Sequence, residues 1–178
     1  MRLFRLFTAL AAACALTAAA AQSYPTRTMK IIVPFTAGSS TDILCRVVAE
    51  HLTTTLGQPF IVENKPGAGG SIGTELAVKS APDGYTLIMA GSGPFGVNPA
   101  LEAKLPYDAV KDFEPIANVG LTPQVFAVGP SAKFRNLKDF VAVAKASPGT
   151  IDYGSLGKGT TSHLAMKYFQ SAAGMKAD

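Results

Sequence analysis

The sequence predicts an α/β fold in which a parallel sheet carries helices on both faces. Short β-branched runs alternate with stretches whose apolar residues recur at helical spacing. Glycine- and proline-rich turns separate the two kinds of segment. Hydrophobic residues make up 48% of the 178 residues, enough for a core that needs no cross-links. A strand–helix–strand–helix–strand order of this kind is typical of parallel sheets.

Residues 1–21 have the three parts of a secretory signal peptide. Arg2 and Arg5 form the positive start, an apolar run without charge follows, and small residues precede a cleavage site before Gln22. Cleavage after Ser23 is the near alternative. We therefore expect the mature chain to work outside the cytoplasm.

Two other interpretations of this start stay open. Residues 6–16 could be an uncleaved anchor, although a membrane-spanning helix needs about 20 apolar residues. Cys14 could carry a lipid, although the leucine usual three residues ahead of such a cysteine is missing. If the segment is removed, Cys45 is the only cysteine left, so no internal disulfide is expected. The charge of +4 for the whole chain then falls to about +2, which is too weak to indicate nucleic-acid binding.

The expected elements of the first half follow the alternation directly. Strands are predicted at residues 30–35, 60–62 and 85–90, the last of them buried. Helices are predicted at residues 42–56, with Gly57 as the C-cap, and at 71–81. The second half is less regular. After a loop-rich stretch at 91–105, we expect strands at 116–119, 124–128 and 151–153, and helices at 138–146, capped by Asn136, and at 161–173.

The second half contains too few strand–helix units to complete a domain. We therefore expect lobe one over residues 22–125 and the truncated beginning of a second lobe over residues 126–178. The alternative is a complete domain of about 150 residues in which the last helix packs as a terminal element.

The loop after the first strand combines small residues, hydroxyls and a helix N-terminus. It covers residues 34–42 and includes Ser39, Ser40 and Thr41. Free N–H groups and the positive end of the helix dipole favour an anion such as a carboxylate. The alternative is that Ser40 or Thr41 simply caps the helix.

Two glycine-rich segments suggest nucleotide motifs but lack the required residues. In residues 67–73, Ile72 stands where the dinucleotide motif needs its third glycine, so a tight turn into a helix is predicted. Near Lys158, a phosphate loop needs serine or threonine at the position of Gly159. What remains over residues 154–163 is a second hydroxyl-rich loop that enters a helix N-terminus.

Catalytic and metal-binding patterns are weak. His51 and His163 have no cysteine or histidine at metal-ligand spacing, so no metal or cofactor is expected. Cys45 lies in a helical stretch and is predicted to be a buried structural thiol. The protein is expected not to be an enzyme; the alternative is an exported hydrolase that uses Cys45, Ser92 or His163.

From residue 24 to residue 176 the chain resembles the Bug-type periplasmic solute-binding receptors of tripartite tricarboxylate transporters. No single segment is specific, but the ordered set is. It comprises Tyr24-Pro25, Val33-Pro34-Phe35 with Gly38 and Asp42, Leu56-Gly57-Gln58, residues 62–70 (VENKPGAGG), residues 82–87 (PDGYTL), residues 112–116 (DFEPI) and residues 153–159 (YGSLGKG).

The resemblance implies a type II periplasmic-binding-protein (Venus-flytrap) fold with a ligand cleft between two lobes, of which this chain holds lobe one and the start of lobe two. It also implies a monomer that captures a small carboxylate and delivers it to the membrane permease; a sensory role is the alternative. The implied ligand-binding residues lie on the two loops and after the third strand: Phe35, Gly38, Ser39, Ser40, Thr41, Asp42, Ser92, Ser155, Gly157, Thr160, Thr161, Ser162 and His163, with Asn98 a weaker candidate. Ser39 stands where the family usually has a second glycine, so its side chain is expected to change ligand preference.

Overall fold

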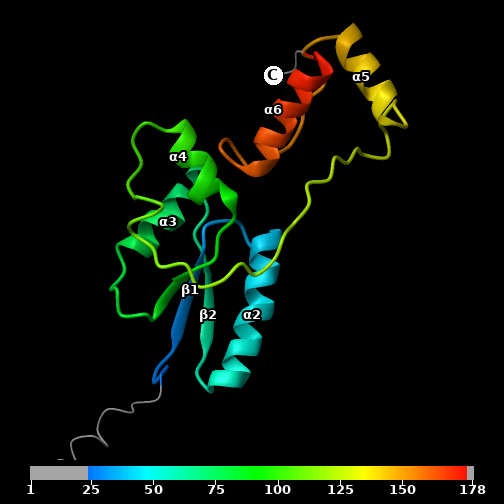
Figure 1. Cartoon of the computed structure of the whole chain (residues 1–178). Coiled ribbons are helices and arrows are strands. Elements are labelled where there is room, and N and C mark those ends of the chain that lie inside the picture. The colour runs from blue at the N-terminus through cyan, green and yellow to red at the C-terminus, as the bar shows by residue number, and fades with distance from the viewer. Residues whose placement is uncertain (1–23, 176–178) are drawn as a thin grey trace, which may run out of the picture.

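The computed structural model describes residues 24–175 (Figure 1). Its sheet has three parallel strands in the order β2-β1-β3, formed by β1 (Met29–Val33), β2 (Phe60–Asn64) and β3 (Thr86–Ile88). The predicted parallel sheet is therefore confirmed. The predicted signal peptide and its cleavage site lie outside the described residues.

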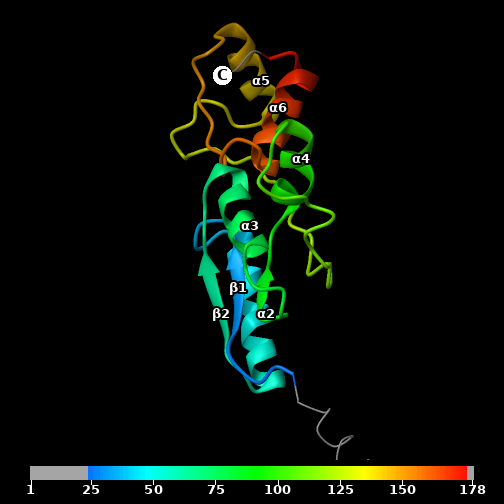
Figure 2. The same cartoon turned by 90° about the vertical axis from the view of Figure 1, so that its left-hand side faces the viewer.

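Helices cover both faces of this sheet. Helix α2 (Ser40–Leu56) lies along one face and α3 (Ser71–Val78) lies on the other (Figures 1 and 2). Gly57 ends α2 in the left-handed conformation, as its position predicts. A 3₁₀ turn over Ala68–Gly70 leads into α3, which confirms a tight turn at this glycine-rich segment. Helix α3 ends three residues before the predicted boundary at residue 81.

The main core lies between the sheet and α2. The central strand, β1, contributes Met29, Ile31 and Val33 to it. Cys45 is fully buried there as a free thiol, as predicted. Strand β3 is only half-buried, so the prediction of a buried third strand is wrong; β3 is an edge strand of the sheet. The buried members of this core are Met29, Ile31, Val33, Cys45, Ala49 and Phe60.

The loop-rich stretch after β3 is partly helical. A π-helical turn, η2 (Gly93–Val97), continues into the short helix α4 (Asn98–Leu101). The hydroxyl of buried Tyr107 donates to the carbonyl of Pro94 (2.8 Å) and so connects η2 to the segment that follows α4. We refer to residues 24–113 as the sheet unit.

The second half contributes two helices, α5 (Leu137–Ala146) and α6 (Thr161–Ala173), which confirm the predicted positions. Asn136 caps α5, as expected, by accepting from the Asp139 N–H at 2.9 Å. We refer to α5 and α6 as the helical pair. They pack around a second, smaller core whose buried members are Phe140, Ala144 and Met175.

The predictions of strands at 116–119, 124–128 and 151–153 are wrong, because the structure has no strand at these positions. Ile116 and Val125 are 80% and 82% exposed. A β-branched run forms a strand only when a neighbour pairs with its backbone groups, and no described segment pairs with these. Residues 116–128 instead run as an extended connection between the sheet unit and the helical pair (Figure 1), and residues 151–153 lie in the segment between α5 and α6.

The first described residues are fastened to the turn before β3. The Tyr24 hydroxyl donates to the Gly84 carbonyl, and the Thr26 N–H donates to the Tyr85 hydroxyl (3.1 Å). Arg27 pairs with Asp83 (2.7 Å) and lies 4.2 Å from the centre of the Tyr85 ring. This N-terminal clasp sits at the amino end of the strands.

Within residues 24–175, no helix has both the length and the apolar character needed to cross a membrane.

Candidate functional site

The first loop, residues 34–42, joins β1 to α2 and is organised by a buried carboxylate. Asp42 is 2% exposed. Its oxygens accept from the Gly38 N–H (2.8 Å), from the Arg46 guanidinium (3.0 and 3.1 Å) and from the Asn64 amide (2.9 Å). Asp42 therefore ties the loop, its own helix and the end of β2 together.

These bonds keep Asp42 ionised. Hydrogen bonds from Arg46 and then from the Gly38 N–H lower the pKa of Asp42 from 3.8 to about 2, against the opposing effect of burial. A negative charge consequently occupies the first turn of α2. That charge offsets the positive end of the α2 dipole from inside the protein.

The N-cap of α2 is Ser39. Its hydroxyl accepts from the Asp42 N–H at 3.3 Å. The interpretation of Ser40 or Thr41 as the cap is therefore wrong, since the helix begins at Ser40 itself. Gly38, with φ of +82°, makes the turn that a residue with a side chain would make only under strain.

The second loop, residues 154–163, enters α6 and is organised mainly by neutral hydroxyls, with one backbone bond from the Thr160 N–H to the Gly157 carbonyl (3.2 Å). The N-cap Thr160 is 3% exposed; its hydroxyl donates to the Gly157 carbonyl (2.6 Å) and accepts from the His163 N–H (3.5 Å). No acidic residue lies in the first turn of α6. The positive end of the α6 dipole is therefore not offset as that of α2 is.

Two serines complete the second loop. The Ser162 hydroxyl accepts from the Leu156 N–H (3.1 Å), and the Ser155 hydroxyl accepts from the Gly157 N–H (3.2 Å). Both side chains are engaged in shaping the loop.

The structure brings some of the predicted site residues together. The Ser92 and Thr161 hydroxyls lie 2.8 Å apart, which joins the loop after β3 to the start of α6. A Cβ on Gly93 would lie 3.6 Å from the Gly159 carbonyl oxygen and 4.0 Å from the Phe35 ring, so Gly93 lies close to both loops. Within residues 24–175 no hydrogen bond joins the first loop directly to the second, so Ser40 and Thr41 do not contact the second loop in this way.

Two buried polar atoms near these loops have no hydrogen-bond partner among the described residues: Asn98 Oδ1 and His163 Nδ1. The other end of the Asn98 amide donates to the Gly69 carbonyl (3.2 Å) and the Ser71 hydroxyl (3.0 Å). Asn98 is 1% exposed and so belongs to the packed interior.

Sequence reasoning missed Asn64 and Arg46. Asn64 also donates to the Phe35 carbonyl (3.1 Å), so it supports the first loop at two points. The available signal was its place at the carboxyl end of β2, since neighbouring parallel strands end at the same edge.

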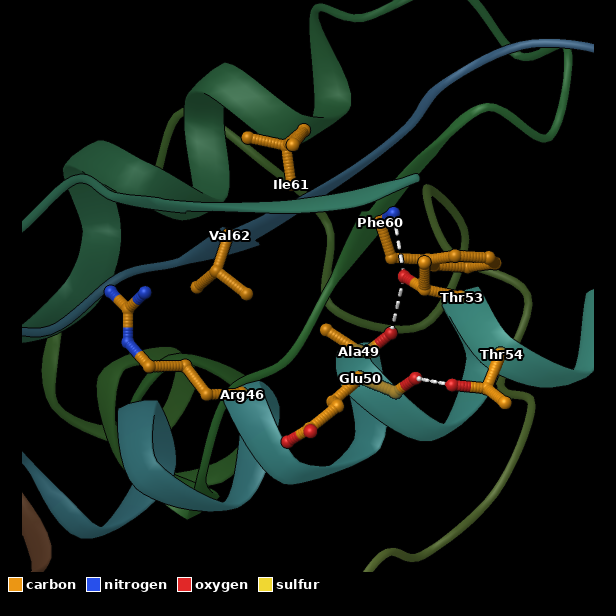
Figure 3. A pocket seen from close by; sticks show the side chains of 8 residues that line it. All are labelled: Arg46, Ala49, Glu50, Thr53, Thr54, Phe60, Ile61 and Val62. Carbon is orange, nitrogen blue, oxygen red and sulfur yellow. Dashed lines mark hydrogen bonds between the residues drawn. The ribbon is translucent and has the colours of Figure 1, made fainter. Parts of the chain in front are cut away.

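A surface groove of about 400 Å³ lies elsewhere, between α2 and β2 (Figure 3). Thr53 bridges its two sides, because its hydroxyl donates to the Ala49 carbonyl (2.7 Å) and accepts from the Phe60 N–H (3.0 Å). None of the predicted ligand-binding residues lines it; the lining residues are Arg46, Ala49, Glu50, Thr53, Thr54, Phe60, Ile61 and Val62.

The candidate nucleophiles lack activating partners. Burial raises the pKa of the Cys45 thiol to about 11, so it stays protonated at neutral pH. Among the described residues no hydrogen bond joins Ser92 to a histidine; its partner is Thr161. The same residues contain no group of three or more histidine, cysteine or acidic side chains that could hold a metal ion.

Comparison with known proteins identifies the family. The model of the tripartite tricarboxylate transporter family receptor, TctC, matches residues 44–177, and the chain belongs to this family. BugT of Bordetella pertussis is 41% identical over 155 residues, which cover 86% of this chain and 48% of BugT. The chain thus spans about half the length of the curated relatives it matches.

Solved structures agree with this assignment. R. palustris Rpa4515 with adipate superposes with a TM-score of 0.83 at 31% identity, covering 87% of this chain and 52% of that one. MatC from Rhodopseudomonas palustris with bound malate gives 0.72 at 27% identity, covering 87% and 53%. The predicted fold class is therefore confirmed: the chain has the α/β fold of TctC-type periplasmic binding proteins over about half of their length.

Proposed function

We propose that this chain forms part of a periplasmic receptor that binds a small carboxylate between two lobes and passes it to a tripartite transporter permease. It acts as a monomeric binding protein and not as an enzyme. The family match supports receptor function, and the solved relatives named with adipate and malate support a carboxylate ligand. The residues 1–21, with the pattern of a signal peptide, support export to the periplasm.

The observation that carries the carboxylate proposal is at the N-terminus of α6, where no acidic side chain offsets the positive end of the helix dipole. Helix α2 has the ionised Asp42 in its first turn, whereas α6 has no acid there. An incoming carboxylate supplies the charge that α6 lacks, and the Thr161 hydroxyl stands beside that position. We assign the main ligand contacts to the second loop and the Ser92 side, and a supporting role to the first loop.

The proposed lobes, residues 22–125 and 126–178, are supported by how the aromatic residues pack. The centre of the Phe126 ring lies 4.8 Å from that of Phe140 and 6.2 Å from that of Phe169, so Phe126 packs with the helical pair. The Phe95 ring packs at 5.0 Å on Phe113 in the sheet unit.

Titration calorimetry of the complete receptor against a panel of di- and tricarboxylates, with malate and adipate among them, tests the proposal. Thr161→Ala removes one hydrogen bond to a charged ligand group and is expected to weaken binding by about 1.5–3 kcal/mol. Thr54→Ala is the matched control, since Thr54 bonds only the Glu50 carbonyl of its own helix, far from both loops. Absence of heat with every acid of the panel, in a folded sample of the complete receptor, contradicts the carboxylate proposal. An unchanged Kd for Thr161→Ala removes that residue from the site.

A further inference from the structure

The second loop rests on the sheet unit through a set of unusually close contacts. The Ser92 and Thr161 hydroxyls form one of them. Two glycines form the others: a Cβ on Gly159 would lie 2.6 Å from Asn98 Oδ1, and a Cβ on Gly69 would lie 2.7 Å from the Lys158 carbonyl oxygen. Figures 1 and 2 both place the segment before α6 against the end of the sheet unit where α4 begins.

Both glycine contacts exclude any side chain. Real Cβ atoms do not approach other atoms this closely, so any larger residue forces the second loop away from the sheet unit. At Gly159 the opposing atom belongs to a buried side chain, and Asn98 is held from its other end by Gly69 and Ser71. Asn98 therefore cannot turn aside without losing both of these bonds.

Asn98 Oδ1 is buried without a hydrogen-bond partner among the described residues, and Gly159 lies close against it. A buried unpaired acceptor is unfavourable, so the docked arrangement carries a free-energy cost at Asn98. This cost opposes docking of the second loop. The Ser92–Thr161 hydrogen bond and any ligand bound there must offset it.

We propose that Asn98, Gly69 and Gly159 form a closure seat: the surface on which the second loop docks when the two lobes close, with Asn98 as a positioning residue that does not contact the ligand. The functional meaning rests on the proposed receptor. The seat itself is a property of the chain and can be tested without ligand.

Disulfide trapping measures the docking directly. Ser92→Cys and Thr161→Cys place two thiols where the hydroxyls now lie 2.8 Å apart, in the full chain with Cys14→Ser. Cys45 does not interfere, because it is buried and its thiol has a raised pKa. The rate of cross-linking under a mild oxidant then reports how often the second loop occupies the seat.

Gly159→Ala is expected to slow cross-linking at least tenfold. The matched control is Gly157→Ala in the same loop, which also has positive φ but open space around its Cβ position, and it should leave the rate within twofold. Gly69→Ala and its control Gly57→Ala repeat the test from the other side of the contact. Equal cross-linking rates within both pairs overturn the proposal. Thermal melts followed by circular dichroism establish that each variant is folded. If one pair of variants fails to fold, the other pair decides.

Malate and adipate separate this inference from the proposed function. If the glycine pairs differ as expected and no carboxylate binds the receptor with Ser92 and Thr161 intact, the seat stands and the carboxylate proposal fails. If a carboxylate binds that receptor and the cross-linking rates are equal within both glycine pairs, the ligand proposal stands and the seat is overturned.

Discussion

The two loops look alike in sequence but are built differently. Each follows a strand or extended segment, is rich in glycine and hydroxyls, and enters a helix. The first contains the ionised carboxylate of Asp42, which bonds Gly38, Arg46 and Asn64. The second is held by neutral hydroxyls, chiefly that of Thr160.

The difference indicates that a helix N-terminus attracts an external anion best when no acidic side chain of the protein already occupies its first turn. The first loop already contains its own anion, Asp42, which is bonded to Gly38, Arg46 and Asn64. The second loop keeps its unbalanced dipole, so it is the part that gains most from a bound carboxylate. Four measurements test this comparison, beginning with the largest expected effect.

Asp42→Ala should lower the free energy of unfolding by about 3 kcal/mol, because it leaves the Gly38 N–H and the Asn64 amide without their acceptor. Urea unfolding measures this. The control is Asp139→Ala, which removes an exposed first-turn acid from α5 and should cost less than about 1 kcal/mol. Equal losses would mean that burial of Asp42 adds nothing to the first loop.

Acidification should weaken the first loop selectively. The folded pKa of Asp42 is about 2, below its ordinary 3.8, so its stabilisation is complete above about pH 5 and is lost as pH falls through about 2. The shift corresponds to about 2 kcal/mol of unfolding free energy. Stability measured against pH should show this loss, and Asp42→Asn should remove most of it; an unchanged profile in that variant would assign the loss to other carboxyls.

Thr160→Ala should destabilise α6 by about 1 kcal/mol, the ordinary effect of losing an N-cap. Hydrogen exchange at the amides of α6 resolves this local effect. Thr161→Ala, one residue further on, is the control, because its hydroxyl does not cap the helix. A loss as large as that for Asp42→Ala would contradict the weaker organisation inferred for the second loop.

Ser39→Gly should have the smallest effect, a few tenths of a kcal/mol, because glycine is itself a tolerated N-cap. Ser39→Ala should cost about 1 kcal/mol, since alanine supplies no acceptor for the Asp42 N–H. Thermal unfolding of the two variants separates them. If Ser39→Gly instead changes malate affinity strongly, the Ser39 hydroxyl contacts ligand in addition to capping the helix.

The sequence predicted the elements whose signals are local. The helix over 161–173 and the caps at Gly57 and Asn136 depend on neighbouring residues alone, and they appear at the expected positions. The strands expected at 116–119 and 124–128 depend on distant partners, which a pattern of β-branched residues does not reveal.

The site shows the same division. The two hydroxyl-rich loops were visible in the sequence, and the pairing of Ser92 with Thr161 brings two predicted residues together. The roles of Asp42 and Asn98 were not visible, because both depend on burial among residues more than 20 positions away, such as Asn64 and Gly69. The predicted ligand contacts themselves stay predictions.

The N-terminal clasp has a practical consequence for measuring binding. Tyr24 and Arg27 hold the chain at the turn before β3, whereas the first loop begins where β1 ends. A five-residue strand spans about 16 Å, so these two places lie at opposite ends of the sheet. A sensor surface joined ahead of Tyr24 would therefore present both loops outward, and captured molecules would share one orientation with their loops open to the flowing sample.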